Sequence, residues 1–382
     1  MESLRNQMVF FKILIRPIPA YYIVLTFLFI SLGGASRSLS ASDDSTSVDT
    51  LGFEKSSLSI LPIIFYSPQT KLAAGVLPTY IYRSSAESRP SSVTFPAYYT
   101  LNKQISISVE PQVYYRNGLY RLSGLLYYQK WPDLFYGLGN ATSVDDEEEY
   151  TTRSAGGLID FQRRFGSSLY FGVVGEFSHS ELIEIESRGL LSGGDITGAE
   201  TGTVSGAGVS ISWDSRDNIF FPRNGSYHVV SAASYGSVLS GDYFYNGYII
   251  DLRKYAALDS NKIIAVQAYG SFTDGDPPFG WLPRLGGIIR GYYPLRYIDR
   301  SLLAFQAEYR MHPVWRRFGI IGFAGIGAVA DGLSDFRSDN FKFAAGVGIR
   351  YLFIQAEGLN IRFDIGFGEE SSEIYFNIGE AF

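Results

Sequence analysis

The chain has 382 residues, a formal net charge of −6 at pH 7, 16% aromatic residues and no cysteine. Charged residues make up only 18% of it, below the roughly 25% of an average soluble domain. The lack of cysteine excludes disulfides and cysteine–metal sites, and the three histidines are far apart in sequence. The acidic balance gives no support for a nucleic-acid partner. We therefore expect no metal centre, no cofactor and no nucleic acid.

The first 35 residues have the order of a secretory signal peptide. Arg5, Lys12 and Arg16 precede an apolar run at 21–34, and a serine-rich stretch follows. The run is short for a retained membrane anchor, which needs about 20 apolar residues. We predict that 1–35 is cleaved and that 36–57 is a short flexible segment before a folded domain at 58–382.

The domain at 58–382 alternates between apolar and polar residues with the period of a β-strand. At 104–115 the odd positions are mostly apolar and the even positions mostly polar, and 302–311 and 361–367 repeat the alternation. The polar face carries charges and glycines, and no helical period covers the apolar face. Strands of about ten residues with an apolar outer face and a polar inner face are typical of a transmembrane β-barrel. Such a barrel is closed because lipid cannot satisfy an open sheet edge.

Sixteen segments show this alternation, and an even number suits an antiparallel barrel with both chain ends in the periplasm. We place the strands near 58–67, 70–83, 92–101, 104–115, 118–130, 149–163, 168–179, 201–213, 225–237, 242–256, 261–272, 301–311, 317–329, 340–352, 359–367 and 373–382. Connections after odd-numbered strands then face outward and include the longer ones, such as 181–200 and 273–300. The sequence thus predicts an all-β fold, a sixteen-stranded antiparallel transmembrane β-barrel.

One periplasmic connection, WDSRDNIFFPRNGSY at 213–227, is rich in charged and turn-forming residues. Its charged side chains are close enough in sequence to pair locally, and proline followed by Asn-Gly favours a tight reversal. The residues that we single out are Asp214, Arg216, Asp217, Asn218, Pro222 and Gly225. Taken alone, this segment would be interpreted as a solvated turn with no further role.

The outer connection at 273–300 is the longest irregular stretch of the domain and contains RLGGIIRGYYPLR at 284–296. Its central residues Ile289, Arg290, Gly291 and Tyr292 set an arginine between isoleucine and glycine. Glycine allows a sharp bend of the backbone. The feature to be explained is why a long loop carries an arginine between isoleucine and glycine.

The chain ends in FNIGEAF at 376–382. Asn377, Gly379 and Phe382 follow a polar-x-Gly-x-x-aromatic pattern, in which the last residue is aromatic. We expect the last strand to reach Phe382 and to place its ring in the aromatic girdle at the membrane interface.

Together the turn, the IRGY loop and the C-terminal pattern resemble the BamA/TamA superfamily of outer-membrane barrels, also called the bacterial surface antigen family. The resemblance implies that the sixth outer loop folds into the lumen and that its arginine pairs with carboxylates on the inner wall. Strand alternation sends Glu308 and Asp364 inward, so they are the candidate partners of Arg290. Relatives often carry an acid in a third place, where this chain has Gly325. The C-terminal pattern resembles the signal by which barrels are recognised for insertion.

The resemblance also implies a location and a class of function. Members insert outer-membrane proteins or export polypeptides, and receive clients through periplasmic POTRA domains, for which 36–57 is too short. We expect an integral protein of the bacterial outer membrane that acts in outer-membrane protein assembly or in polypeptide or lipid transport. Its expected partners are membrane lipid, lipopolysaccharide, the barrel-assembly machinery for its own insertion, and client polypeptides.

Two other readings remain open. A small-solute diffusion pore, or a purely structural barrel, would have the same strand pattern, although the long loop at 273–300 counts against a wide channel. An enzyme is disfavoured because no nucleophile–base constellation stands out in the sequence.

Overall fold

The computed structural model describes residues 12–14, 56–67, 71–83, 88–237 and 240–382. Its strands are β1 (Lys12–Leu14), β2 (Ser56–Ser67), β3 (Lys71–Tyr82), β4 (Ser91–Thr94), β5 (Ala97–Thr100), β6 (Ile105–Tyr115), β7 (Tyr120–Phe135), β8 (Glu148–Phe165), β9 (Leu169–Ile185), β10 (Gly202–Asp214), β11 (Gly225–Tyr235), β12 (Tyr245–Ala257), β13 (Lys262–Gly275), β14 (Ser301–Trp315), β15 (Phe318–Ala330), β16 (Lys342–Ile354), β17 (Leu359–Gly368) and β18 (Ser371–Ile378). Short 3-10 turns are η1 (Val144–Asp146), η2 (Leu191–Gly193), η4 (Phe279–Trp281), η5 (Leu285–Gly287), η6 (Leu333–Asp335) and η7 (Ser338–Asn340). None of the helical turns in the described ranges is long and apolar enough to cross a lipid bilayer.

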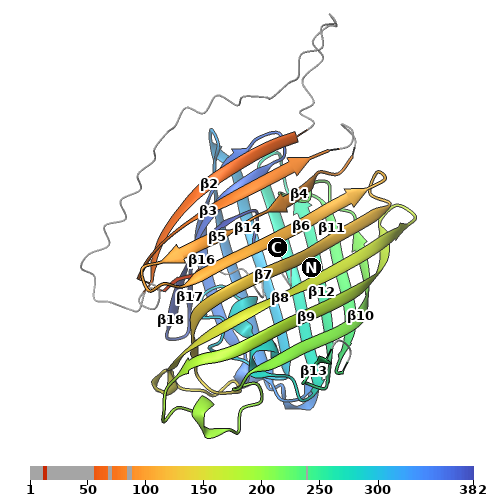
Figure 1. The fold of residues 1–382 in the computed structure, drawn as a ribbon. Helices are drawn as coiled ribbons and strands as arrows, with labels where there is room; N and C mark the ends of the chain where they lie inside the picture. Colours follow the sequence, from red (N-terminus) through yellow and green to blue (C-terminus); the bar gives the residue numbers. More distant parts are fainter. Residues whose placement is uncertain (1–11, 15–55, 68–70, 84–87, 238–239) are drawn as a thin grey trace, which may run out of the picture.

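The strands β2 to β18 form an antiparallel barrel of sixteen staves, as the sequence predicts (Figure 1). A stave here is one strand position in the barrel wall, whether one continuous strand or two short strands in line fill it. Sixteen is reached because β4 and β5 share one stave: each pairs with β3 on one side and β6 on the other. The stave is interrupted at Phe95 and Pro96, where proline has no backbone N–H to donate to a ladder.

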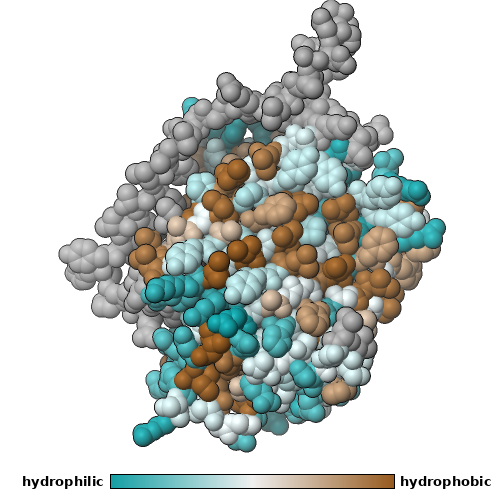
Figure 2. All heavy atoms as spheres, viewed as in Figure 1, coloured by the Kyte–Doolittle hydropathy of each residue, from teal (hydrophilic) through white to brown (hydrophobic). Residues whose placement is uncertain are grey.

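The polar–apolar alternation of the sequence separates side chains that face the lumen from side chains that face outward. Along β14, Gln306, Glu308 and Arg310 are buried, whereas Phe305 and Tyr309, at the alternate positions, are exposed. Figure 2 shows apolar residues gathered over the strands on one face of the barrel. Exposed large apolar side chains of this kind belong to the lipid-facing surface of an outer-membrane barrel.

Three hairpin strands are longer than predicted. β7 continues to Phe135, and β8 and β9 extend with it, so that Trp131 pairs with Thr152 and Phe135 with Glu148. The predicted outer loop that begins at Trp131 is therefore strand in its first part, which carries the sheet beyond the other staves.

The N-terminal predictions are only partly within the described residues. β1 lies inside the predicted signal peptide and pairs with β18, from Lys12 opposite Tyr375 to Leu14 opposite Glu373. The predicted flexible segment at 36–57 overlaps β2 by two residues, because β2 begins at Ser56. Residues 36–55, on which the expected lack of POTRA domains depends, lie outside the described ranges, and cleavage after 35 stays a prediction.

The end of the chain corrects a prediction. β18 stops at Ile378 rather than at Phe382, because Gly379 adopts a left-handed conformation with φ +85°. The last residues then turn inward, and the Phe382 ring is buried against Tyr227 and Tyr255 inside the barrel. The predicted position of Phe382 in the aromatic girdle is therefore wrong.

Candidate functional site

The outer connection between β13 and β14 folds into the lumen, as predicted. Leu285, Ile288, Ile289 and Tyr292 of this loop pack in one buried apolar cluster with side chains of the wall: Tyr269, Leu302, Ala304, Val329 and Ala344. Burial of these apolar residues against the inner wall is what holds the loop inside instead of in water.

Arg290 is one of several charged residues of this loop, and it is 4% exposed. Its Nη1 donates to Asp364 Oδ2 on β17 at 2.6 Å, and its Nη2 donates to Glu308 Oε1 on β14. The guanidinium also lies over the Phe323 ring on β15, 3.7 Å from the ring centroid. The structure thus brings Arg290 together with both carboxylates singled out from the sequence, in a setting where a buried guanidinium needs paired acceptors.

Each carboxylate also binds an arginine of the wall. Arg310 Nε donates to Glu308 Oε2 at 2.7 Å. Arg350 pairs with Asp364 Oδ1 and, through Nε, with Glu380 Oε2 at 2.7 Å. Glu380 follows the inward turn after β18, so the end of the chain joins the same network. Sequence reasoning missed these wall arginines, although strand alternation sends Arg310 and Arg350 inward with the carboxylates.

Gly325 has a positive role in this packing. A Cβ at Gly325 would lie 2.8 Å from Ile289 Cδ1, so the missing side chain leaves room for the loop. The place of the expected third acid is therefore taken by Ile289 of the loop. The ring of Phe323, two residues earlier on β15, lies against the Arg290 guanidinium. Gly291 makes the bend, with φ +120°, and its N–H donates to Tyr375 Oη at 2.7 Å. Tyr292 Oη donates to the Phe343 carbonyl at 2.6 Å.

The periplasmic connection between β10 and β11 is held by its own motif residues. Asp214 is fully buried and accepts from Arg216 Nε at 3.0 Å and from Arg89. Arg216 in turn lies over the Tyr227 ring, 4.2 Å from its centroid. Gly225 has φ +104°, and a Cβ there would lie 2.1 Å from the Ser215 carbonyl oxygen. The neighbouring backbone therefore leaves room for glycine but not for a side chain.

Asp217 and Asn218 satisfy the backbone of this turn. Asp217 accepts from the N–H groups of Arg223 at 2.9 Å and Asn224 at 3.1 Å, the two residues that follow Pro222. Asn218 Oδ1 accepts from Phe220 N at 2.7 Å and Phe221 N at 2.9 Å, while its Nδ2 donates to the Glu357 carbonyl at 3.0 Å. The last bond ties the turn to the connection between β16 and β17.

The apolar part of this turn lies inside the barrel end. Ile219 and Phe220 are buried in a cluster with wall residues, namely Ile81, Tyr114 and Leu359. Phe221 is 9% exposed and its ring centroid lies 5.2 Å from that of His312. The reading as a merely solvated turn is therefore wrong. The sequence signal was the run IFF at 219–221, which has no reason to occur in a turn exposed to water.

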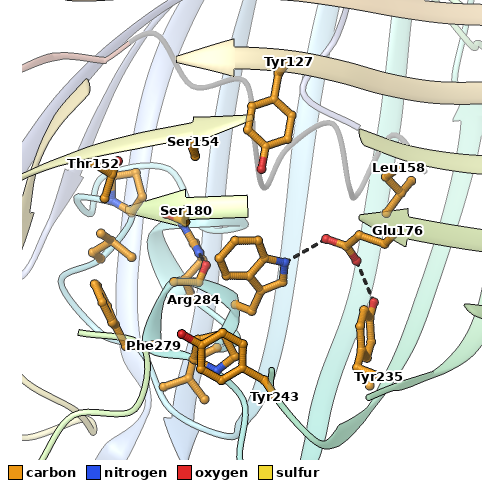
Figure 3. A pocket seen from close by; sticks show the side chains of 18 of the residues that line it. Tyr127, Thr152, Ser154, Leu158, Glu176, Ser180, Tyr235, Tyr243, Phe279 and Arg284 are labelled. Carbon is orange, nitrogen blue, oxygen red and sulfur yellow. Dashed lines mark hydrogen bonds between the residues drawn. The ribbon is translucent and has the colours of Figure 1, made fainter. Parts of the chain in front are cut away.

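A cavity of about 300 Å³ remains between the inserted loop and the opposite wall of the lumen. Figure 3 shows Glu176 of β9 at the wall of this cavity, with Tyr235 of β11 on one side of its carboxylate. Trp281 Nε1 donates to Glu176 Oε1 at 2.8 Å, and Tyr235 Oη donates to Glu176 Oε2 at 2.7 Å. In the described part of the chain, no group of three His, Asp or Glu side chains could hold a metal ion.

A sixteen-stave barrel with an apolar outer face and a loop anchored in its lumen defines an integral β-barrel of the outer membrane. The chain belongs to the Omp85 superfamily, whose domain model matches residues 90–382. This match confirms the resemblance drawn from the three motifs.

Two solved structures share the fold. BamA from Haemophilus ducreyi lacking POTRA domains 1–3 matches with a TM-score of 0.53 at 11% sequence identity, over 85% of this chain and 69% of that chain. CdiB from Acinetobacter baumannii matches with a TM-score of 0.55 at 13% identity, over 85% of this chain and 60% of that chain. This chain thus spans less than two thirds of the CdiB chain. Comparison with curated proteins gives no match.

Proposed function

We propose that this barrel acts in outer-membrane protein assembly, or in polypeptide or lipid transport, by engaging its client at the junction of β18 and β2. The observation that carries the proposal is that the lumen is filled from both ends. The loop at 276–300 packs against β14–β17, and the turn at 215–224 covers the other end of the lumen. A folded client element or a chain segment has little room along the barrel axis.

The junction has the features of a weak edge. β18 has 8 residues and pairs with β17 at eight positions, whereas β14 has 15 residues. Within the described residues, the other edge of β18 pairs with β1 over three residues. β2 carries Pro62, which cannot donate a ladder hydrogen bond. An exposed strand edge is a template for the addition of another strand, or for separation into lipid.

The proposal includes partners and excludes catalysis. Membrane lipid and lipopolysaccharide would contact the apolar outer face, client polypeptides would engage the edge of β18, and the cell's barrel-assembly machinery would insert the chain itself. No chemical step is part of the proposed role. The motif at 213–227 holds the turn in place, and the motif at 289–292 holds the loop in the lumen.

A seam cross-link tests this function. Leu61 of β2 and Ile378 of β18 pack against one cluster, and the chain has no cysteine of its own. Leu61→Cys with Ile378→Cys, joined by a bismaleimide, would tie the seam. Phe363→Cys with Phe376→Cys is the matched control, because these residues are opposite each other in the β17–β18 ladder. In liposomes, the seam cross-link should stop assembly of an unfolded barrel client, and the control cross-link should leave it intact.

A diffusion pore is the second candidate, and the cavity of about 300 Å³ beside the loop is the observation that favours it. A pore would conduct ions steadily in a planar bilayer, and its conductance would be the same with and without the seam cross-link. Absence of client assembly by the uncross-linked protein, together with such conductance, would replace the first proposal by the second.

A further inference from the structure

The cavity beside the inserted loop has a wall of rigid aromatic rings. Tyr235 of β11 and Tyr245 of β12 stack with ring centroids 4.2 Å apart and planes 5° apart. Tyr235 is fixed further by Glu176, and so is Trp281 of the loop. Trp131 and Tyr127 line the same space from β7. Aromatic rings held in this way give flat apolar faces without loss of conformational entropy when a ligand packs on them.

Between the rings the cavity is lined by hydroxyl groups that the protein leaves unused. Ser154 of β8 and Ser271 of β13 are 5% and 6% exposed, and both line the cavity. Neither hydroxyl takes part in a hydrogen bond with another described residue, and neither is among the fully buried atoms that lack a partner. Their oxygen atoms are therefore open to the cavity. Ser231 of β11 and Thr152 of β8 line it in the same way.

The carboxylates of Glu176 and Asp133 in the cavity already accept hydrogen bonds. Both oxygens of Glu176 accept hydrogen bonds, from Trp281 and Tyr235 (Figure 3). Asp133 accepts from Tyr293 Oη and from the Leu134 N–H. Arg284 donates to the Gly280 carbonyl. Glu200 is exposed at the rim, where water screens it. Besides the Arg284 guanidinium, the wall offers a ligand a set of neutral groups that both donate and accept, next to flat apolar faces.

We infer that this cavity binds an uncharged saccharide. Sugar rings combine ring hydroxyls, which match serine and threonine hydroxyls, with C–H faces, which pack on aromatic rings. A cation would need a carboxylate oxygen that is free to face it, and an anion would meet two carboxylates, Glu176 and Asp133, against one arginine, Arg284. A polar lumen cavity of this size, with a few placed hydroxyls among aromatic side chains, has the composition of a small-molecule site.

The site is independent of the proposed assembly function. It spans the wall from β5 to β13, and its lining residues Tyr98 and Trp131 also pack in the cluster beside Leu61 and Ile378. Its ligand would contact Trp281 at the start of the loop rather than Arg290. Occupation would brace the loop against the opposite wall, because Trp281 and the strand hydroxyls would then share one ligand.

The test uses the full chain in a detergent without a sugar head group. Maltotriose, lactose and diacetylchitobiose are titrated by calorimetry and by indole fluorescence, since Trp131 and Trp281 are two of the four tryptophans. Tetramethylammonium and acetate are the charged probes. We expect at least one saccharide to bind with a Kd on the order of 1 mM or tighter and to change the fluorescence, whereas the charged probes do neither.

Two serine variants locate the site. Ser154→Ala and Ser271→Ala should each weaken saccharide binding by about five-fold, the effect of one neutral hydrogen bond. Ser205→Ala is the matched control, because the Ser205 hydroxyl also has no partner but does not line the cavity. The saccharide affinity of this variant should be unchanged. Heat-modifiable migration on a gel checks that each variant is folded. The inference is overturned if no saccharide binds, if only a charged probe binds, or if all three variants bind alike.

Discussion

At the scale of single residues, the position of Arg290 between two carboxylates is a consequence of burial. A guanidinium taken out of water loses its hydration energy, and only well-placed hydrogen-bond acceptors offset that loss. Glu308 and Asp364 supply these acceptors, and each is held in place from its other side by Arg310 or Arg350. The loop is thus bound by apolar packing and fixed in register by charge.

Replacement of Arg290 by alanine should loosen the loop. The change removes the loop cation from two fully buried carboxylates, which keep only their wall arginines, so we expect a loss on the order of 3 kcal/mol of unfolding free energy. The folded, faster-migrating band should convert at a lower temperature on a gel. Arg300→Ala is the control, because its side chain is 43% exposed and its acid partners are 3.4 and 3.9 Å away. Equal melting of Arg290→Ala and the unmodified chain would contradict the anchoring role.

An acid at Gly325 should not restore the third partner that relatives often carry. The Cβ of Gly325→Asp would be within 2.8 Å of Ile289 Cδ1, and we expect overpacking to cost about 1–3 kcal/mol. Gly322→Ala is the control on the same strand, since its Cβ would meet nothing within 4 Å. Denaturant unfolding followed by tryptophan fluorescence compares the two. A stabilised Gly325→Asp variant would show that Arg290 lacks a partner in the native protein.

At the scale of elements, the turn between β10 and β11 shows how one connection can hold itself and close an opening. Asp217 and Asn218 satisfy its backbone, which leaves the apolar residues Ile219, Phe220 and Phe221 free to enter the barrel end. Buried apolar area, rather than the charged motif, decides where the turn lies. The charged residues decide its shape.

The double variant Phe220→Ala and Phe221→Ala should open this end. Loss of two large rings leaves the turn without its apolar contacts to Leu359 and His312, so ion flow past it should increase several-fold in a planar bilayer. Phe165→Ala with Phe171→Ala is the control, because these exposed rings pack edge to face on the outer side of β8 and β9. Unchanged conductance in the Phe220/Phe221 variant would mean that the turn does not limit passage.

At the scale of the whole molecule, the lumen contains two inserted segments in series, the loop at 276–300 and the turn at 215–224. Two barriers in series each limit flow, so removal of one leaves the other. The barrel wall around them is continuous in sequence order from β2 to β18, and its short last strand is at the seam.

Deletion of 275–298 should therefore raise conductance only partly, and deletion together with Phe220→Ala and Phe221→Ala should raise it by more than the product of the separate effects. Circular dichroism of each purified variant checks that the barrel is formed. If the deletion alone already gives the full conductance of the combined variant, the turn is no barrier and the loop is the single plug.

The sequence alone determined the stave number, the inward residues and the sixth-loop motif. Strand alternation has a strict period of two and lipid requires a closed sheet, so side-chain direction follows from position. Glu308 and Asp364 were reached in this way. Their approach to Arg290 depended on the loop, whose path the alternation does not encode.

Only the tertiary structure decided the contacts made by irregular backbone. The inward turn of 379–382, the entry of Phe220 and Phe221 into the barrel end, and the packing of Ile289 into the space at Gly325 all join residues far apart in sequence. Such segments have no period, and their place is set by which apolar surface and which buried charge they can satisfy. That choice exists only once the wall of the barrel is in place.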